Sequence, residues 1–182
     1  MADQLALFGD PPAPKMHRGA VFSDCGRYRY QLTRVWDAAL PRVAFLLLNP
    51  SKAGDERDDG TSTKCVGFAQ RFNVEGQRYG GCDLVNLYGW IDTEPRALFE
   101  ARRSGIDVVG PANVAYVEQV LARAALRVVA WGGNADGFSP IEKFAFLRRF
   151  APLYSLGRNE DGSPTHPGRI AYETPLERYL TV

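Results

Sequence analysis

The residues best suited to chemistry in this 182-residue chain are a few amides, one histidine and small turn residues, gathered in four short segments. Three segments follow or interrupt apolar runs typical of buried strands, and the fourth lies in a loop rich in proline and glycine. The segments are Asn49-Pro50-Ser51, Asn86, Gly132-Gly133-Asn134 and Thr165-His166-Pro167-Gly168. Because ligands of open α/β sheets bind outside the carboxyl ends of the strands, we expect the four segments to converge on one site.

Each of these candidates also has an ordinary structural interpretation. Asn-Pro and Pro-Ser pairs are common in turns, so a turn explains residues 49–51 as well as a binding site does. Asn86 lies between apolar neighbours, where an unpaired amide costs about 1–3 kcal/mol; it either bonds to nearby backbone or reads the edge of a ligand. A lone loop histidine such as His166 is more often incidental than catalytic, and acidic residues such as Asp58-Asp59 before a helix usually cap it.

The composition excludes several classes of protein. Lys and Arg number 22 and Asp and Glu 21, a net charge of +1, which excludes a polybasic protein that coats DNA but leaves a local basic face possible. Three scattered cysteines and two histidines form no zinc or iron–sulfur pattern, so we expect reduced, mostly buried thiols and no metal or cofactor. The chain shows no phosphate-binding glycine motif, no membrane span and no secretory signal, which favours a cytoplasmic protein without membrane association.

The remaining pattern alternates apolar strands with amphipathic helices. It predicts an α/β fold, a three-layer α/β/α sandwich with a mainly parallel central sheet, as a single domain over residues 20–182. Residues 1–19 lack a periodic pattern and are expected to form a flexible tail. The expected strands are Tyr28–Trp36 at an edge, Val43–Leu48, Cys82–Tyr88, Arg127–Trp131 and Tyr154–Leu156. The expected helices run from Thr61 or Ser62 to Phe72, over Glu94–Arg103 and Asn113–Ala125, and from Ser139 to Phe150.

Longer stretches around the polar segments resemble a known family. In chain order, LLLNPSKAG, DDGTSTKCVGFAQRF, DLVNLYGW, VVAWGG and DGSPTHPGRI resemble a bacterial and phage family called domain of unknown function 1643, over about residues 25–172. That pattern in turn resembles the uracil-DNA glycosylase superfamily. There one strand ends in Asn-Pro or Asp-Pro, a later strand ends in a base-reading asparagine, and a His-Pro loop closes the site. The resemblance implies a glycosylase-like fold.

The glycosylase resemblance implies a role for each residue. Asn49 would position the attacking water, and His166 would stabilise the charge that develops on the leaving base. Asn49 is a poor general base, so the chemistry is expected to be slow unless Asp58 or Asp59 assists it, and Asp59 is the further candidate catalytic residue. The residues expected to bind substrate are Pro50, Ser51, Asn86, Gly132 and Arg169, with Asn86 reading the Watson–Crick edge of an extruded base.

Two departures from the glycosylase pattern affect these roles. Ser51 follows Pro50 where the glycosylases have Gly or Tyr, so the floor of the pocket is expected to differ. Gly168-Arg169 replaces the usual Ser-Pro, so the wedge into DNA is expected to be altered or absent. Phe72, Tyr88 or Trp90 could stack on a base, although aromatic residues at these spacings more often belong to the core.

A second resemblance lies in the N-terminal segment. Gln4-Leu5-Ala6-Leu7-Phe8 resembles the pentapeptide by which bacterial replication and repair proteins bind the sliding clamp. Leu5, Leu7 and Phe8 would be the apolar anchors and Gln4 would supply hydrogen bonds as the segment folds on binding. The alternative is an apolar segment that packs on the protein's own surface.

Together these features predict a DNA glycosylase-like enzyme that hydrolyses the N-glycosidic bond of an unusual or modified base. Its partners would be DNA, either duplex or single-stranded, and the sliding clamp. Two alternatives stay open. A hydrolase or transferase acting on free nucleosides or nucleotides suits the near-zero net charge, because a free nucleotide needs no extended phosphate track. A protein that binds DNA or a modified base without catalysis is the other.

Overall fold

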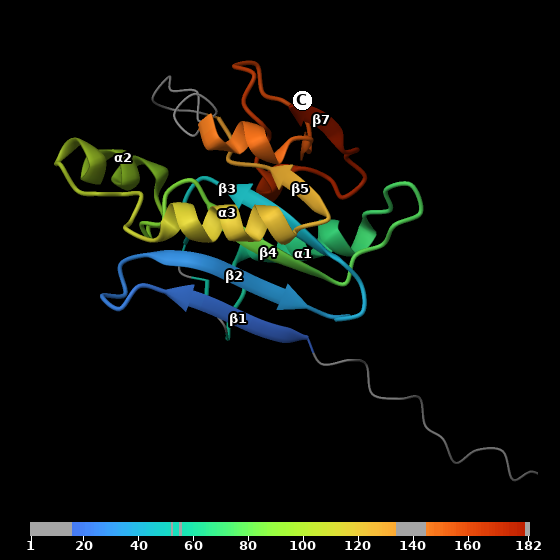
Figure 1. Ribbon diagram of the computed structural model, residues 1–182. Helices are drawn as coiled ribbons and strands as arrows, with labels where there is room; N and C mark the ends of the chain where they lie inside the picture. The colour runs from blue at the N-terminus through green and yellow to red at the C-terminus, as the bar shows by residue number, and fades with distance from the viewer. Residues whose placement is uncertain (1–15, 52, 55, 134–144, 181–182) are drawn as a thin grey trace, which may run out of the picture.

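A computed structural model describes residues 16–51, 53–54, 56–133 and 145–180, which form a mixed α/β structure around one seven-stranded sheet (Figure 1). The strands are β1 (His17–Phe22), β2 (Arg29–Val35), β3 (Arg42–Leu47), β4 (Gly81–Asn86), β5 (Leu126–Val129), β6 (Leu153–Ser155) and β7 (Glu177–Leu180). The helices are α1 (Gly60–Arg71), α2 (Pro95–Arg103) and α3 (Asn113–Arg123), with the short 3-10 helices η1 (Ala145–Phe150) and η2 (Pro167–Arg169).

The sheet is parallel only in its centre. The strand order is β1-β2-β4-β3-β5-β6-β7, in which β4, β3, β5 and β6 pair in parallel while β1–β2, β2–β4 and β6–β7 pair antiparallel. The expected mainly parallel sheet is therefore correct for the central strands and wrong for both flanks. The two edge strands, β1 and β7, were not expected, because half-exposed strands lack the continuous apolar run that marks a buried one.

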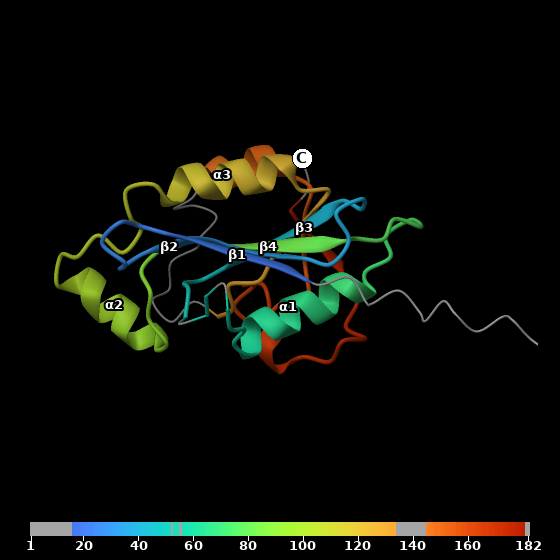
Figure 2. The same ribbon diagram turned by 90° about the horizontal axis from the view of Figure 1, so that it is seen from below.

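Both faces of the central strands are covered, which explains their continuous apolar sequences. Phe45 and Val128 face a core that includes Phe68 of α1. Residues one position along, such as Leu46 and Val129, face a second core with α3 and η1. Figure 2 shows α1 and α3 on opposite sides of the sheet. Of the three free cysteines, Cys65 and Cys82 are buried and Cys25 is exposed.

The helices agree with expectation except at their ends. α2 and α3 lie where the pattern predicts them. α1 is capped by Asp59 rather than by Thr61 or Ser62: a carboxylate oxygen of Asp59 accepts from the Ser62 amide at 2.7 Å. Of the helix expected to end at Phe150, only η1 lies within the described residues. Residues 1–15, with the pentapeptide, lie outside them, and β1 begins at His17, inside the segment expected to be tail.

The chain reverses direction across the sheet at β3. After β3, the chain passes through α1 to β4 on one side, and the next parallel strand, β5, pairs with β3 on its other side. Such a reversal leaves a crevice outside the carboxyl ends of the strands. The arrowheads of β3 and β5 in Figure 1 point toward this end, beside which α2 lies. Within the described segments, no helix has the length and apolar character needed to cross a bilayer.

Candidate functional site

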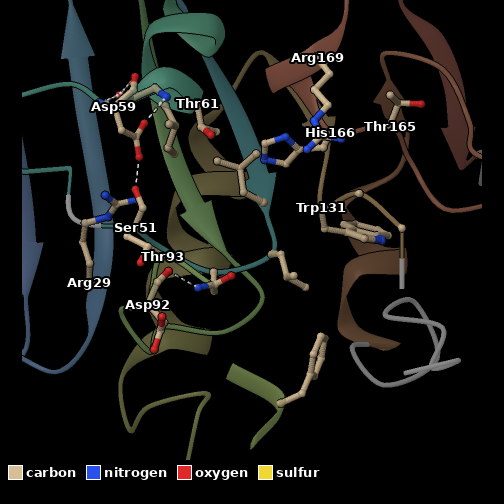
Figure 3. A pocket seen from close by; sticks show the side chains of 18 of the residues that line it. Arg29, Ser51, Asp59, Thr61, Asp92, Thr93, Trp131, Thr165, His166 and Arg169 are labelled. Atoms are coloured by element: carbon tan, nitrogen blue, oxygen red, sulfur yellow. Dashed lines mark hydrogen bonds between the residues drawn. The ribbon is translucent and has the colours of Figure 1, made fainter. Parts of the chain in front are cut away.

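A cavity of about 540 Å³ lies at this crevice, where the ends of β3 and β5 meet the first turn of α1 and the loop before η2 (Figure 3). Its volume lies within the range of about 300–1,000 Å³ that is typical of small-molecule sites. The lining residues come from every segment around the crevice and include Arg29, Asn49, Ser51, Asp59, Thr61, Ser62, Leu84, Asp92, Thr93, Phe99, Trp131, Gly132, Gly133, Asn159, Thr165, His166 and Arg169.

Most residues expected to form the site do line this cavity. They are Asn49, Ser51, Asp59, Gly132, His166 and Arg169. Pro50 and Asn86 do not line it. The expected stacking aromatics are not among the lining residues either: Phe72 and Tyr88 are core residues, and Trp90 packs against Tyr28. Phe99 and Trp131 are the aromatic side chains that face the cavity.

Asn49 lines the cavity, and its side-chain amide is held in place. Its Nδ2 donates to the backbone oxygen of Asp92 at 2.9 Å, which fixes the amide. Pro50 also helps to fix this segment, because its carbonyl accepts a hydrogen bond from the Asp92 amide at 3.0 Å. Within the described segments nothing donates to Oδ1 of Asn49, so this oxygen can accept a hydrogen bond from a water or a ligand.

His166 presents a donor. The Gly168 amide donates to Nδ1 at 3.2 Å, so the neutral ring carries its proton on Nε2. Burial lowers the pKa of His166 below its usual 6.5; the Asp59 charge opposes this shift and Arg169 adds to it. At neutral pH the ring is therefore uncharged and offers Nε2–H as a hydrogen-bond donor.

Gly132 allows the His166 loop to approach the end of β5. Its backbone has φ +84°, a conformation that favours glycine, and a Cβ there would lie 3.2 Å from Cβ of His166. The Gly132 amide also donates to the carbonyl of Pro164 at 3.0 Å. A larger residue at this position would displace the histidine.

Asp59 is an anchored carboxylate. One oxygen caps α1 through the Ser62 amide, and the other accepts a hydrogen bond from the Ser51 hydroxyl. Burial acts to raise the pKa of Asp59, but these hydrogen bonds and the charge of Arg29 outweigh it and lower the pKa. Asp59 is thus a fixed negative charge rather than a ready proton acceptor. Its neighbour Asp58 is engaged elsewhere, in ion pairs with Arg18 and Arg34.

Arg29 is a lining residue that the sequence did not reveal. It is 2% exposed, its Nη1 donates to the Ala53 carbonyl at 2.7 Å, and its Nε has no partner. Burial lowers its pKa to about 10, against the opposing charge of Asp59. Val21 pairs with Gln31 but Phe22 pairs with Arg29, a bulge in β2 that changes which side chains face the cavity. No sequence pattern marks such a bulge.

Asn86 lies next to residues that line the cavity. Its side chain is fully buried, and neither Nδ2 nor Oδ1 has a hydrogen-bond partner. It pairs in register with Leu47, and strand alternation places it on the same face as Leu84; both leucines line the cavity. Trp131, which does line the cavity, also has an unpartnered and buried Nε1.

Residues 29–168 match the family model described as Protein of unknown function (DUF1643). The chain belongs to this family. The match runs from Arg29 to Gly168, so it includes every lining residue named above except Arg169. No curated protein and no solved structure matches the chain.

The part of this DUF1643 protein that the structure describes contains no group of three or more His, Cys, Asp and Glu side chains that could hold a metal ion. The polar groups that line the cavity are instead hydrogen-bond donors and acceptors, the two carboxylates of Asp59 and Asp92, and two arginines, beside apolar side chains such as Phe99. Such a set suits a substrate with polar edges, and it can stabilise charge of either sign.

Proposed function

We propose that this DUF1643 protein is a DNA glycosylase-like enzyme that hydrolyses the N-glycosidic bond of an unusual or modified base in DNA, on a three-layer fold of the uracil-DNA glycosylase type. The observation that carries the proposal is that an acceptor, an anion and a neutral donor line one cavity. These are Oδ1 of Asn49, the carboxylate of Asp59 and Nε2–H of His166.

His166 would act on the leaving base. As the bond between the sugar C1′ and the base nitrogen breaks, its electron pair remains on the base, which becomes an anion. A donor aimed at that charge stabilises a transition state by about 3–4 kcal/mol in a site that excludes water. The neutral state of His166 suits this role, because it donates a hydrogen bond without transferring its proton.

Asn49 and Asp59 would act on the sugar. Loss of the base leaves a cation at C1′, and the fixed charge of Asp59 would stabilise it. Asn49 would hold a water whose oxygen bonds to C1′, and the proton released by this water would end on the departed base. Since Asn49 does not remove the proton before attack, the chemistry is expected to be slow.

DNA would have to deliver the base in an extruded form. An enzyme cannot reach the glycosidic bond within a stacked duplex, so it flips the nucleotide out or binds a single strand. Asn86, which is paired with the cavity-lining Leu47, has two unpartnered polar atoms that suit the edge of a base. Since Asn86 does not line the cavity, its predicted reading of that edge would require the base to reach beyond the lining residues.

Base release is the measurement that tests this proposal. Oligonucleotides carrying uracil, hydroxymethylated, glucosylated and deazapurine bases would be incubated with the protein, and free base would be detected by mass spectrometry. We expect release of one base, lost in His166→Ala and retained in the matched control His17→Ala, which alters the exposed histidine of β1. Release that is unchanged in both Asn49→Ala and His166→Ala would refute the site assignment.

Free nucleotides are the second candidate substrate, favoured by the net charge of +1. A hydrolase or transferase of this kind would act on nucleosides or nucleotides with little dependence on salt, because few counterions are released. Tight binding without any product would instead identify a protein that only recognises a base.

Recruitment to DNA is proposed through Gln4-Leu5-Ala6-Leu7-Phe8, on the support of its sequence alone. The expected result is binding of the full chain to a bacterial sliding clamp that is lost when Leu7 and Phe8 are both replaced by Ala.

A further inference from the structure

Two arginines of β2 are equally buried but differently paired. Arg34 is fully buried, and it is ion-paired with Asp58 at 2.9 Å. Its other donors reach the carbonyls of Thr33 at 2.8 Å and Gly54 at 2.7 Å. The side chain of Arg29, a residue 2% exposed, has a single hydrogen bond, to the Ala53 carbonyl, and the residues that the structure describes offer it no ion pair.

An uncompensated buried charge is unusual because transfer of an ion from water into a protein is costly unless an opposite charge accompanies it. Arg34 shows that this chain supplies such a charge where an arginine is structural. Asp59 raises the pKa of Arg29, but it forms no ion pair with it. Its carboxylate instead accepts from Ser51 and Ser62.

The surroundings of Arg29 suit an anion. Figure 3 shows Arg29, Ser51 and Asp59 along one side of the cavity, with His166 and Trp131 on the other. Thr61 and Ser62, in the first turn of the 12-residue helix α1, line the same cavity. The start of a helix carries a partial positive charge. The amide and hydroxyl of Ser62 already donate to Asp59, and the hydroxyl of Thr61 can donate to an anionic oxygen. The negative charge of Asp59 weakens this field, and Arg29 offsets it.

We propose that Arg29 binds an anionic group of the substrate, a phosphate or a carboxylate, between β2 and the first turn of α1. The inference rests on the proposed function in one respect: it takes the cavity to be the substrate site. The anionic group balances the buried positive charge of Arg29 and places the rest of the substrate toward His166, across the cavity. Two sources have this chemistry, namely the phosphate of a nucleotide and a carboxylate substituent on a modified base.

Thermal unfolding without ligand is the first test, with Arg29→Met and Arg34→Met as a matched pair. Methionine keeps much of the arginine volume and removes the charge. We expect Arg29→Met to unfold at the wild-type temperature or above it, while Arg34→Met unfolds lower because Asp58 loses its buried partner. If Arg29→Met is destabilised as strongly as Arg34→Met, Arg29 is structural and the proposal is wrong.

Ligand binding is the second test and distinguishes the two sources. The probes are inorganic phosphate, a deoxynucleoside with its 5′-monophosphate, and cytosine with 5-carboxycytosine, each at millimolar concentration, with binding followed by calorimetry. A phosphate group or a carboxylate should strengthen binding to the wild type by about 10- to 100-fold, the range expected for charge-assisted hydrogen bonds, and this gain should vanish in Arg29→Met. Arg29→Lys should retain part of it, because the charge remains but the planar fork is lost.

Two results would overturn the inference: no preference of the wild type for either anionic probe, or an equal preference in Arg29→Met. The measurement involves no bond cleavage, so it separates this inference from the proposed glycosidic chemistry. Anion binding without base release would retain Arg29 as an anion site and reject the glycosylase, and base release with unchanged anion affinity in Arg29→Met would do the reverse.

Discussion

The two ends of the parallel strands differ in whether buried polar groups of the described residues have hydrogen-bond partners. Toward the amino end, Asp83 is 2% exposed, accepts from Gln31 and Thr33, and is ion-paired with Arg42 and Arg123. At the carboxyl end, the described residues include several buried polar atoms without any partner. They are Nε of Arg29, both side-chain polar atoms of Asn86, Oδ1 of Asn113, Nε1 of Trp131 and Oγ of Ser155.

This difference indicates where a ligand belongs. A folded chain normally pairs its buried polar groups, because each unpaired group costs about 1–3 kcal/mol. The chain meets this requirement at one end of the sheet and not at the other, and the cavity lies at the end where it does not. A substrate or ordered water that fills the cavity would supply partners to Arg29 and Trp131, the two of these residues that line it, and we infer that stability is reduced there in favour of binding.

The largest effect is expected at His166. His166→Ala should lower base release about 10²- to 10³-fold, because it removes the donor to the leaving base, with little change in thermal stability. Single-turnover rates on the oligonucleotide whose base the wild type releases would measure this loss. A parallel fall in the melting temperature would mean that the histidine is structural, and the contrast between the two ends would fail.

At the amino end the expected effect is on stability. Asp83→Asn should lower the free energy of unfolding by about 2 kcal/mol, because it removes a buried carboxylate that accepts from the buried Gln31 and the partly buried Thr33. The ion pairs add little, since the side chains of Arg42 and Arg123 are 40% and 42% exposed. Urea unfolding would measure the loss. Base release by the folded variant should match the wild type.

Asp59 is expected to contribute both to base release and to stability, and two variants separate these contributions. Asp59→Asn keeps an N-cap side chain of equal quality, so the melting temperature should hardly change. Its lost charge should slow base release about tenfold, by weakening stabilisation of the sugar cation. Asp59→Ala should show the same loss of rate and also destabilise the protein by about 1 kcal/mol. An unaltered rate in Asp59→Asn would limit this residue to capping.

The smallest effect concerns pH. Because burial lowers the pKa of His166 below 6.5 in the folded protein, the unfolded chain takes up the proton more readily. Stability should therefore fall as the pH drops below 6.5, and the acidic midpoint of the activity profile should lie below 6.5. His166→Gln should show a weaker loss of stability over the same pH range. A wild-type acidic midpoint above 6.5 would contradict the lowered pKa.

Sequence reasoning located much of the site for a clear physical reason. Asn49, Gly132 and His166 follow strands or lie in a closing loop, and such positions are readable from apolar runs and turn residues. It missed Arg29, because the bulge that brings this side chain to the cavity depends on strand pairing and not on local sequence.

The fold was predictable to a similar extent. The central strands have continuous apolar runs and α2 and α3 have helical periodicity, whereas β1 and β7 are half-exposed and carry little apolar signal. Asn86 shows the limit most clearly. Its polarity within an apolar strand was visible, but its position beside Leu47, outside the set of residues that line the cavity, required the structure.

The central claim is that the carboxyl end keeps buried polar groups unpaired for a substrate, and the double variant Arg29→Met, Asn86→Val tests it most directly. Both changes remove unpartnered polar atoms, and valine suits a buried strand. The free energy of unfolding in urea should rise by about 1–3 kcal/mol while substrate binding is lost. A fall in the free energy of unfolding, comparable to that of Asp83→Asn, would show that these groups stabilise the fold and would contradict the account.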